Sequence, residues 1–376
     1  MATNGELLLA NTTAPSAPPE LTPQKLRSLR VLSPVEVDRI CTDETQKPFL
    51  VKGLLPAKSV AIAAGDSTIG KSPLVLQLAL AVAGGVPFLG MPTKQGRVLY
   101  FDLENSLSDC KEMRDALVRF LGLSNAPQDF LLVAEPTYNL DRLISETGPQ
   151  LVVIDSVRSF RPDVTDKNAI TGQWLKEIRA SANQYGCSFI LVHHLKKPNR
   201  AREGYLIESD LQSLPVATWM VEMEGPRAFV NQTDVRIAVD RARHDDAALA
   251  IKWSRRVHGD SSIVMLQRVF DDDGEPAGYR HMTGVELLSL DRRQAWANLP
   301  TEFSFKEAKV TLGRSDDPTN KFLHECIQLE LLEKVARGRY RKIPCDVPQT
   351  RLVIGPASPH TQLDLGKEDR VDREWL

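Results

Sequence analysis

The sequence predicts an α/β protein, in which helices cover both faces of a mostly parallel central sheet and a smaller C-terminal domain follows. Between residues 59 and 192, short apolar runs alternate with stretches of helical character. This alternation is typical of a parallel sheet that is covered on both sides. After the acidic turn Asp271–Gly274 the composition becomes helical and charged, so we expect a domain boundary at this turn.

The bulk composition is that of an ordinary folded protein. With 376 residues, 42% of them hydrophobic and 26% charged, the chain can bury a large core, and its length suggests two domains. The formal net charge of -2 excludes a uniformly basic coat, so a nucleic-acid partner must be met by local basic patches. The cysteines contain no C-x-x-C pair, which indicates reduced structural thiols and no zinc site. They are Cys41, Cys110, Cys187, Cys326 and Cys345.

Residues 1–39 are expected to form a flexible N-terminal arm. The first 24 residues contain four prolines and lack periodic apolar residues, as disordered segments do. Their one apolar run, Leu7–Ala10, is too short for a secretory signal. The sequence also lacks a stretch of eighteen or more apolar residues. We therefore expect a cytoplasmic protein with no membrane partner.

The expected core domain covers residues 40–275 and contains two sets of strands. The first set is separated by helices and forms the parallel part of the sheet; its members are Ser59–Ala63, Val98–Asp102, Phe130–Val133, Leu151–Asp155 and Phe189–Val192. The second set is closely spaced, which suggests hairpins that extend the same sheet; its members are Thr218–Glu222, Val235–Val239, Ala248–Lys252 and Ile263–Gln267.

The expected C-terminal domain covers residues 276–345. Ser304–Glu307 has the pattern of a capping box, and Asp317–Pro318 supplies an N-cap and a first-turn proline for a second helix. Two short strands joined at Ala336–Gly338 follow. Helix, helix and basic hairpin is the order of a winged helix-turn-helix. The tail, residues 346–376, is expected to be disordered.

A glycine-rich segment follows the first expected strand and opens a helix. It reads Gly65-Asp66-Ser67-Thr68-Ile69-Gly70-Lys71-Ser72, and its position between strand and helix distinguishes a P-loop from a chance match, a glycine-rich turn of no function. The glycines let backbone N–H groups curl round phosphates, while Lys71 places a cation against the β and γ oxygens. The Ser72 hydroxyl can bind Mg²⁺. Pro73 falls in the first helical turn, where a missing N–H costs little. The segment predicts an ATP·Mg²⁺ site.

Carboxylates end two expected strands near this segment. The apolar run Leu151–Ile154 ends at Asp155, where a carboxylate can hold the water of the metal, as in a Walker B motif. Glu104 ends the strand that follows the P-loop helix, at the edge where open sheets bind ligands. We predict that Glu104 is the general base that polarises the attacking water. Asp102 is its competitor, and a surface glutamate of no function is the remaining alternative.

The order of these motifs resembles that of the RecA-like ATPases, and more closely that of the RepA-like branch of hexameric replicative helicases of plasmids and mobile elements. The resemblance covers residues 48–256. In that family, the strand after Walker B ends in a polar residue that senses the γ-phosphate. This sequence has the pair His193-His194 there, with His194 as the implied sensor. Because neighbouring strand residues point to opposite faces, one of the two faces the site; a histidine merely buried at a strand end is the alternative.

The resemblance also implies a ring, with a hexamer as the expected homo-oligomer. Family members carry a basic pair on a late strand that reaches the nucleotide of the neighbouring subunit. Arg241-Ala242-Arg243 takes that place, and strand alternation puts both arginines on one face. An arginine supplied in trans would stabilise charge on the transferred phosphoryl group. The alternative is a solvated strand. Lys71, Glu104, His194, Arg241 and Arg243 are thus the expected catalytic residues.

Two basic clusters are candidates for contact with a nucleic-acid backbone. The first lies on a loop that faces the central channel in RecA-like rings, and the second decorates the expected wing. Few aromatic residues accompany them, so base stacking is not supported. The loop cluster is Lys196, Lys197, Arg200 and Arg202, and the wing cluster is Lys334, Arg337, Arg339, Arg341 and Lys342. Solvated basic loops are the alternative for both.

The leading functional hypothesis is an ATP-driven motor related to the RepA-like helicases that moves on single-stranded DNA. Two other hypotheses remain open. One is an ATP-gated regulator or adaptor with slow hydrolysis, in which a winged helix recognises duplex DNA. The other is a RecA-like recombination ATPase. We favour the motor because the predicted hydrolytic set is one that an ATP-gated adaptor could lose.

Overall fold

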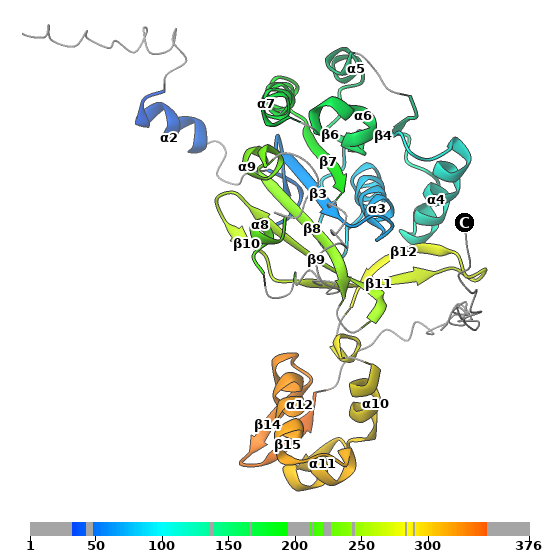
Figure 1. Ribbon diagram of the computed structural model, residues 1–376, viewed down its shortest axis with the longest axis vertical. Helices are drawn as coiled ribbons and strands as arrows, with labels where there is room; N and C mark the ends of the chain where they lie inside the picture. Colours follow the sequence, from blue (N-terminus) through cyan, green and yellow to red (C-terminus); the bar gives the residue numbers. More distant parts are fainter. Residues whose placement is uncertain are drawn as a thin grey trace, which may run out of the picture. The chain divides into compact units, whose positions relative to one another are not determined.

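The computed structural model (Figure 1) describes part of the chain, which divides into two units, Met1–Pro48 and Phe49–Leu376. The described residues are 32–42, 48–135, 139–165, 167–194, 211, 214–220, 227–242, 245–282, 284–288 and 290–343. In the first unit, helix α2 (Pro34–Thr42) begins where Ser33 and Glu36 exchange hydrogen bonds between side chain and backbone. Part of the expected flexible arm is therefore helical. The expected disordered tail lies outside the described residues.

The second unit contains the central sheet, which has ten strands in the order β12-β11-β9-β8-β3-β7-β6-β4-β5, with β10 paired to β9. Strands β8, β3, β7, β6, β4 and β5 pair in parallel, whereas β9, β11 and β12 extend the sheet by antiparallel pairing. The mostly parallel sheet that the sequence predicts is confirmed. The strands are β3 (Val60–Gly65), β4 (Val98–Asp102), β5 (Phe130–Val133), β6 (Leu151–Asp155), β7 (Ser188–His194), β8 (Val235–Ala242), β9 (Asp245–Arg255), β10 (Gly259–Asp260), β11 (Val264–Phe270) and β12 (Pro276–His281).

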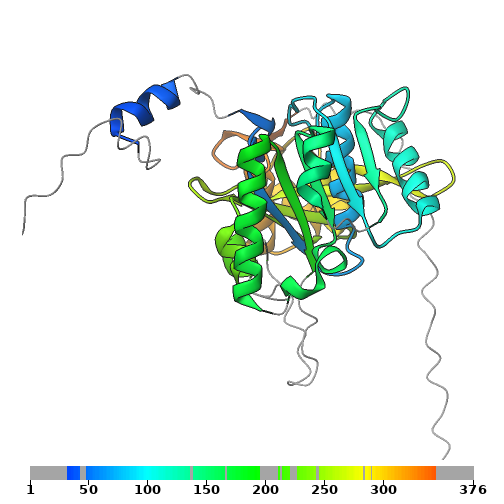
Figure 2. The ribbon, with the colours of Figure 1, turned by 90° about the horizontal axis from the view of Figure 1, so that it is seen from above.

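Helices cover both faces of this sheet, as Figure 2 shows from above. One hydrophobic cluster joins α3 to one face of β3 through Ala61 and Ala63, and a second joins α7 to the other face through Ile62 and Ala64. Alternation of side chains along β3 therefore serves two cores. The helices are α3 (Lys71–Gly84), α4 (Leu107–Phe120), α5 (Leu140–Thr147), α6 (Val157–Phe160), η1 (Pro162–Thr165), α7 (Asn168–Tyr185), α8 (Val216–Trp219) and α9 (Ala228–Gln232). The short strands β1 (Phe49–Val51) and β2 (Leu55–Pro56) form a separate pair.

The strand expected at Thr218–Glu222 is not present in the described residues, because Val216–Trp219 is the helix α8. Pro215 precedes this helix. Val216 and Trp219, three positions apart, are both buried. This spacing is that of a helix and not of a strand. The sequence prediction assigned a strand because the apolar run is too short to show a helical period.

The domain boundary expected at Asp271–Gly274 falls inside the sheet. This segment is the turn between β11 and β12, where the Asp271 carboxylate accepts hydrogen bonds from the backbone N–H groups of Asp273 and Glu275. The side-chain amide of Gln77 on α3 both donates to and accepts from the backbone of Tyr279 on β12. This two-way pairing ties the hairpin to the helix that starts at the P-loop.

The C-terminal part of the chain has its own apolar cluster, centred on Phe322, Leu323 and Trp296. Its three-stranded antiparallel sheet has the order β13-β15-β14, one strand more than the sequence predicts. The predicted capping box, between Ser304 and Glu307, is confirmed at the start of α11. The elements are η3 (Gly284–Leu287), α10 (Leu290–Asn298), β13 (Glu302–Ser304), α11 (Phe305–Leu312), α12 (Asp316–Gln328), β14 (Leu332–Ala336) and β15 (Arg339–Lys342). Within the described residues, no helix has the length and apolar character needed to span a membrane.

Candidate nucleotide site

The glycine-rich loop joins the end of β3 to the start of α3, at the carboxyl end of the parallel strands. Gly70 is the N-cap of α3 and has φ 105°, in the left-handed region that favours glycine. A Cβ atom at Gly70 would lie 2.0 Å from the Tyr279 hydroxyl, and one at Gly65 would lie 2.5 Å from the Val239 carbonyl oxygen. Both glycines are therefore required by close packing against the strands that flank the loop.

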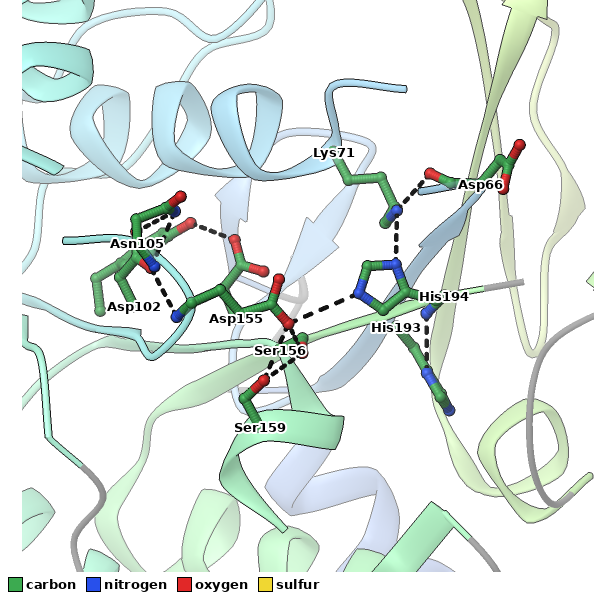
Figure 3. A network of polar contacts seen from close by, with 11 residues as sticks. Asp66, Lys71, Asp102, Asn105, Asp155, Ser156, Ser159, His193 and His194 are labelled. Atoms are coloured by element: carbon green, nitrogen blue, oxygen red, sulfur yellow. Dashed lines mark hydrogen bonds and ion pairs between the residues drawn. The ribbon is translucent and has the colours of Figure 1, made fainter. Parts of the chain in front are cut away.

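Lys71, the first residue of α3, is only 4% exposed. Its ammonium group donates a hydrogen bond to the Asp66 carbonyl oxygen at 2.6 Å and lies 3.3 Å from Nδ1 of His194 (Figure 3). Burial lowers the pKa of Lys71, while the nearby carboxylates of Asp155 and Asp66 oppose that shift. The loop thus holds a desolvated cation beside its own backbone, as phosphate binding requires.

Asp155, at the end of β6, is 3% exposed and accepts a hydrogen bond from the Tyr100 hydroxyl at 2.8 Å. The side chain of Ser72 also forms a hydrogen bond with this carboxyl group. Burial raises the pKa of Asp155 to about 6, more than these hydrogen bonds lower it. A carboxylate and a hydroxyl are the hard oxygen donors that Mg²⁺ prefers, so Ser72 and Asp155 fit the predicted metal. The described residues contain no group of three or more His, Cys, Asp or Glu able to hold a metal.

Glu104 lies just beyond β4 and is the exposed carboxylate of the site. Its Oε1 atom accepts hydrogen bonds from Ser156 and from Ser159, the latter at 3.0 Å, and lies 3.7 Å from Nε2 of His194. The close approach of His194 is the largest cause that lowers the pKa of Glu104 to about 2, and the two serine hydroxyls act in the same direction. The two serines follow Asp155 in the sequence as Asp-Ser-x-x-Ser, a pattern that the sequence analysis did not use.

Asp102, the competitor for the general-base role, is engaged in hydrogen bonds with Glu104 and Asn105. It is 3% exposed. Its carboxylate accepts hydrogen bonds from the backbone N–H of Asn105 at 3.1 Å, from the Asn105 side chain, and from the backbone N–H of Glu104 at 3.3 Å. Asp102 thus holds the turn that presents Glu104, and of these two carboxylates only Glu104 lines the cleft beside the P-loop.

The tandem histidines point in opposite directions from the end of β7 (Figure 3). His194 lies between Lys71 and Glu104. His193 is fully buried, with its ring 4.7 Å from that of Phe229, and its Nδ1 accepts a hydrogen bond from the backbone N–H of His194. Strand alternation thus brings His194 to the P-loop and sends His193 into the core.

A cleft of about 610 Å³ opens beside these residues. Its walls are the P-loop, helix α4 and the β11–β12 hairpin. Arg268 of β11 and Tyr279 of β12 line it, and neither was singled out from the sequence. Both are far from the P-loop along the chain, and only the antiparallel extension of the sheet brings them there.

Among the residues that the structure describes, none of the basic residues predicted to contact nucleic acid or a neighbouring subunit lines this cleft. Arg241 is exposed on β8, and its backbone N–H donates to the Asp240 carboxylate at 2.8 Å. Arg341 forms ion pairs with Glu302 and Glu333, so its charge is neutralised within the three-stranded sheet. Lys342 donates to the carbonyl oxygens of Trp296 and Leu299. Residues on exposed positions of the same hairpin are Lys334, Arg337 and Arg339. Those that lie outside the described residues are Lys196, Lys197, Arg200, Arg202 and Arg243.

The region of the chain that matches known proteins includes Lys71, Glu104 and His194. Residues 25–200 match the family model described as an AAA domain. Two curated relatives are both named DNA repair protein RadA. The one from Halalkalibacterium halodurans is 30% identical over 169 residues, which cover 43% of this chain and 33% of that protein. The one from Bacillus subtilis is 25% identical over 191 residues, which cover 50% of this chain and 39% of that protein. This chain therefore spans between a third and two fifths of the length of these relatives.

Two solved structures also align with the chain. The RadB recombinase has 15% identity and a TM-score of 0.39, and the alignment covers 57% of this chain and 88% of that one. A KaiC-like protein from Pyrococcus horikoshii has 14% identity and a TM-score of 0.39, with coverage of 62% and 93%. The P-loop at the end of β3, the mostly parallel sheet and the AAA-domain match together support a P-loop nucleotide-binding core.

Proposed function

We propose that this protein binds ATP·Mg²⁺ in the cleft beside the P-loop and hydrolyses it to drive work on DNA. The observation that carries the proposal is the convergence of Lys71, His194 and Glu104, from three different elements, at the mouth of the P-loop. These residues are separated by up to 123 positions in the sequence. The alternative is that these residues only stabilise the fold through ion pairs. Their position beside the P-loop, at the edge of the sheet where ligands bind in open α/β folds, favours a role in nucleotide binding instead.

The phosphates would be held by backbone N–H groups of the loop and by Lys71, whose charge is desolvated and close by. Ser72 and Asp155 would hold Mg²⁺, which supplies positive charge against the β and γ oxygens when it is bound. At pH values above about 6, the pKa of Asp155 leaves this carboxyl group ionised. The site therefore supplies its full negative charge to the metal at neutral pH.

Glu104 has the position of the residue that acts on the attacking water. A pKa of about 2 makes it a weak proton acceptor, because general bases work best with a pKa near the operating pH. We infer that Glu104 mainly orients and polarises the water. The water oxygen forms a bond to the γ-phosphorus while the bond between that phosphorus and the β–γ bridging oxygen breaks; both protons of the water stay with the released phosphate, and ADP leaves.

His194 offers a direct link between phosphate binding and the water. Its Nδ1 atom faces the Lys71 ammonium group and its Nε2 atom faces Glu104. The lysine ammonium group can only donate hydrogen bonds. Nδ1 of His194 must therefore accept the hydrogen bond from Lys71, and Nε2 carries the hydrogen atom, which faces Glu104. A γ-phosphate that draws Lys71 away would change both contacts. This relation supports the role of a phosphate sensor for His194.

The work on DNA is proposed from the relatives. Their name, DNA repair protein RadA, favours a DNA-repair ATPase, which is close in kind to the recombination ATPase that the sequence analysis left open. The RepA-like helicase remains a second candidate, supported by the order of motifs. In either case we propose a ring, with a hexamer as the simplest form, in which Arg241 and Arg243 reach the nucleotide of the neighbouring subunit. The C-terminal fold of three helices and three strands is proposed to act as a winged helix.

The proposal is tested by steady-state ATP hydrolysis with and without single-stranded DNA, in the wild type and in Glu104→Gln. We expect Glu104→Gln to lower turnover by roughly 100-fold, the size of loss that follows when a reacting group is no longer held in position, and to keep nucleotide binding. Glu112→Gln, an exposed carboxylate in the same cleft, is the matched control. Unchanged turnover in Glu104→Gln would refute its assigned role.

DNA separates the remaining candidates in the same assay. Stimulation by single-stranded DNA with strand displacement on a forked duplex would favour the helicase, and stimulation without displacement would favour the repair ATPase. Slow turnover that DNA does not change would contradict a DNA-driven ATPase. That outcome favours the ATP-gated regulator.

A further inference from the structure

The wall of the cleft that faces the P-loop carries a cation from the same subunit. Nη2 of Arg268, on β11, donates to the Ile69 carbonyl oxygen at 3.4 Å and to the Tyr279 hydroxyl at 3.3 Å. The guanidinium carbon lies 5.7 Å from the centre of the Tyr279 ring. In the described part of the chain both of these hydrogen bonds use the same nitrogen, so other N–H groups of the guanidinium fork are available to an anion.

Arg268 is held in place before any ligand binds. Tyr279 beneath it is fixed by the two hydrogen bonds between its backbone and the Gln77 side chain, each 2.8 Å long. Its hydroxyl packs against Gly70, where a Cβ atom would lie 2.0 Å away. The guanidinium group itself would lie 3.0 Å from that Cβ position. Arg268 is therefore within reach of any phosphate seated on the first turn of α3.

That first turn lacks one of the amide donors that a helix normally offers to an anion. An α-helix leaves its first N–H groups without intrahelical partners, and these bind phosphate. In α3 they belong to Gly70, Lys71 and Ser72, but the next residue, Pro73, has no N–H group. Pro73 also lines the cleft. The phosphate cradle is thus one backbone donor short on the side that faces the hairpin.

We propose that Arg268 replaces this missing donor and binds the α-phosphate of the nucleotide from within the same subunit. The inference rests on the proposed function, because it assigns one more contact to the same nucleotide. Lys71, His194 and Glu104 mark the γ-phosphate end of the cleft. Within the described residues, Arg268 forms no hydrogen bond or ion pair with any of these three. Its contacts are instead with Ile69, Tyr279 and the Cβ position of Gly70, at the start of the helix that contains Pro73, and we assign it to the phosphate nearest the nucleoside.

The two binding probes are ADP and a non-hydrolysable ATP analogue, each with Mg²⁺, measured by calorimetry on the full chain. We expect Arg268→Ala to weaken both by the same factor, about 10-fold to 100-fold, because a charge-assisted hydrogen bond is lost and both ligands carry the α-phosphate. Arg268→Lys should lose less, since it keeps the charge and loses the fork. The control is Arg119→Ala, which removes a cation of the same cleft that forms an ion pair with Asp271.

Pro73→Ala provides the independent test. This substitution restores the backbone N–H, so in the Arg268→Ala background it should recover about threefold to tenfold in affinity for ADP, the contribution of one neutral hydrogen bond. In the wild-type background, where Arg268 is present, it should change affinity by less. Equal effects of Pro73→Ala in both backgrounds would show that the two residues act separately and would overturn the proposal.

The remaining outcomes each decide one question. If Arg268→Ala weakens the ATP analogue but not ADP, Arg268 faces the γ-phosphate and the assignment is wrong. If it weakens neither, its contacts with Ile69 and Tyr279 are purely structural and the proposal fails, while the proposed function stands. If the wild type binds neither ligand, the proposed function itself fails, and this inference fails with it.

Discussion

Replacing Tyr100 by phenylalanine removes one hydroxyl from the end of the site that we propose holds Mg²⁺, and nothing else. The Tyr100 hydroxyl donates to Asp155 at 2.8 Å, and both side chains are buried on adjacent strands. This hydrogen bond is one of the contacts that limit the rise in the pKa of Asp155, which burial brings to about 6. Tyr100→Phe should therefore raise that pKa further, so that the carboxyl group is protonated at a higher pH.

The size of the effect follows from the hydrogen bond. A bond to a charged group contributes about 1.5 to 3 kcal/mol, which corresponds to roughly one to two pKa units. With a pKa of about 6, about one tenth of the wild-type carboxyl groups are ionised at pH 5, against roughly one hundredth if the pKa rises by about one unit. The ratio of mutant to wild-type turnover should therefore fall about tenfold between pH 8 and pH 5.

The assay is steady-state ATP hydrolysis from pH 5 to pH 8, at a Mg²⁺ concentration well below half-saturation, where turnover follows the ionised fraction. Protonation of the nucleotide is the same for both proteins and cancels in the ratio. Tyr185→Phe, at the end of α7, is the matched control and should give a ratio independent of pH. A constant ratio for Tyr100→Phe would refute the link between this hydroxyl and metal binding through Asp155.

Three further predictions concern the loop, the buried carboxylate and the ring. Gly70→Ala should abolish nucleotide binding, because its Cβ would meet the Tyr279 hydroxyl at a φ of 105°; Gly148→Ala, with φ 57° and open space around it, measures the backbone penalty alone. Asp155→Asn should raise the free energy of unfolding by about 3 kcal/mol at pH 8 and leave it unchanged below about pH 3. The reason is that a folded-state pKa of about 6, above the ordinary 3.8, costs stability only where the unfolded carboxyl group is ionised. Chemical denaturation at both pH values checks this, and equal shifts would contradict it. Arg241→Ala subunits mixed into the wild type should lower turnover by more than their fraction, whereas loss in simple proportion would argue against a contact in trans.

The sequence by itself determined the central sheet and the phosphate-binding loop. Strands such as Leu151–Asp155 and the segment Gly65–Ser72 are encoded by contiguous residues whose period and spacing are readable without neighbours. Local pattern failed at Val216–Trp219, where a four-residue helix has too few residues to show its period. It also failed at Asp271–Gly274, because an acidic hairpin turn and a domain boundary have the same composition.

Only the tertiary structure decided which polar residues share the site. Ile69 and Arg268 meet across 199 positions, and Glu104 and Ser156 across 52. These meetings result from strand order, which depends on how buried surfaces pair rather than on any local signal. The same holds for Arg341. The sequence made it a candidate for contact with nucleic acid, and the structure shows that it forms ion pairs with Glu302 and Glu333. Sequence specifies the chemical groups that are available, and the pairing of distant strands determines which of them face the same ligand.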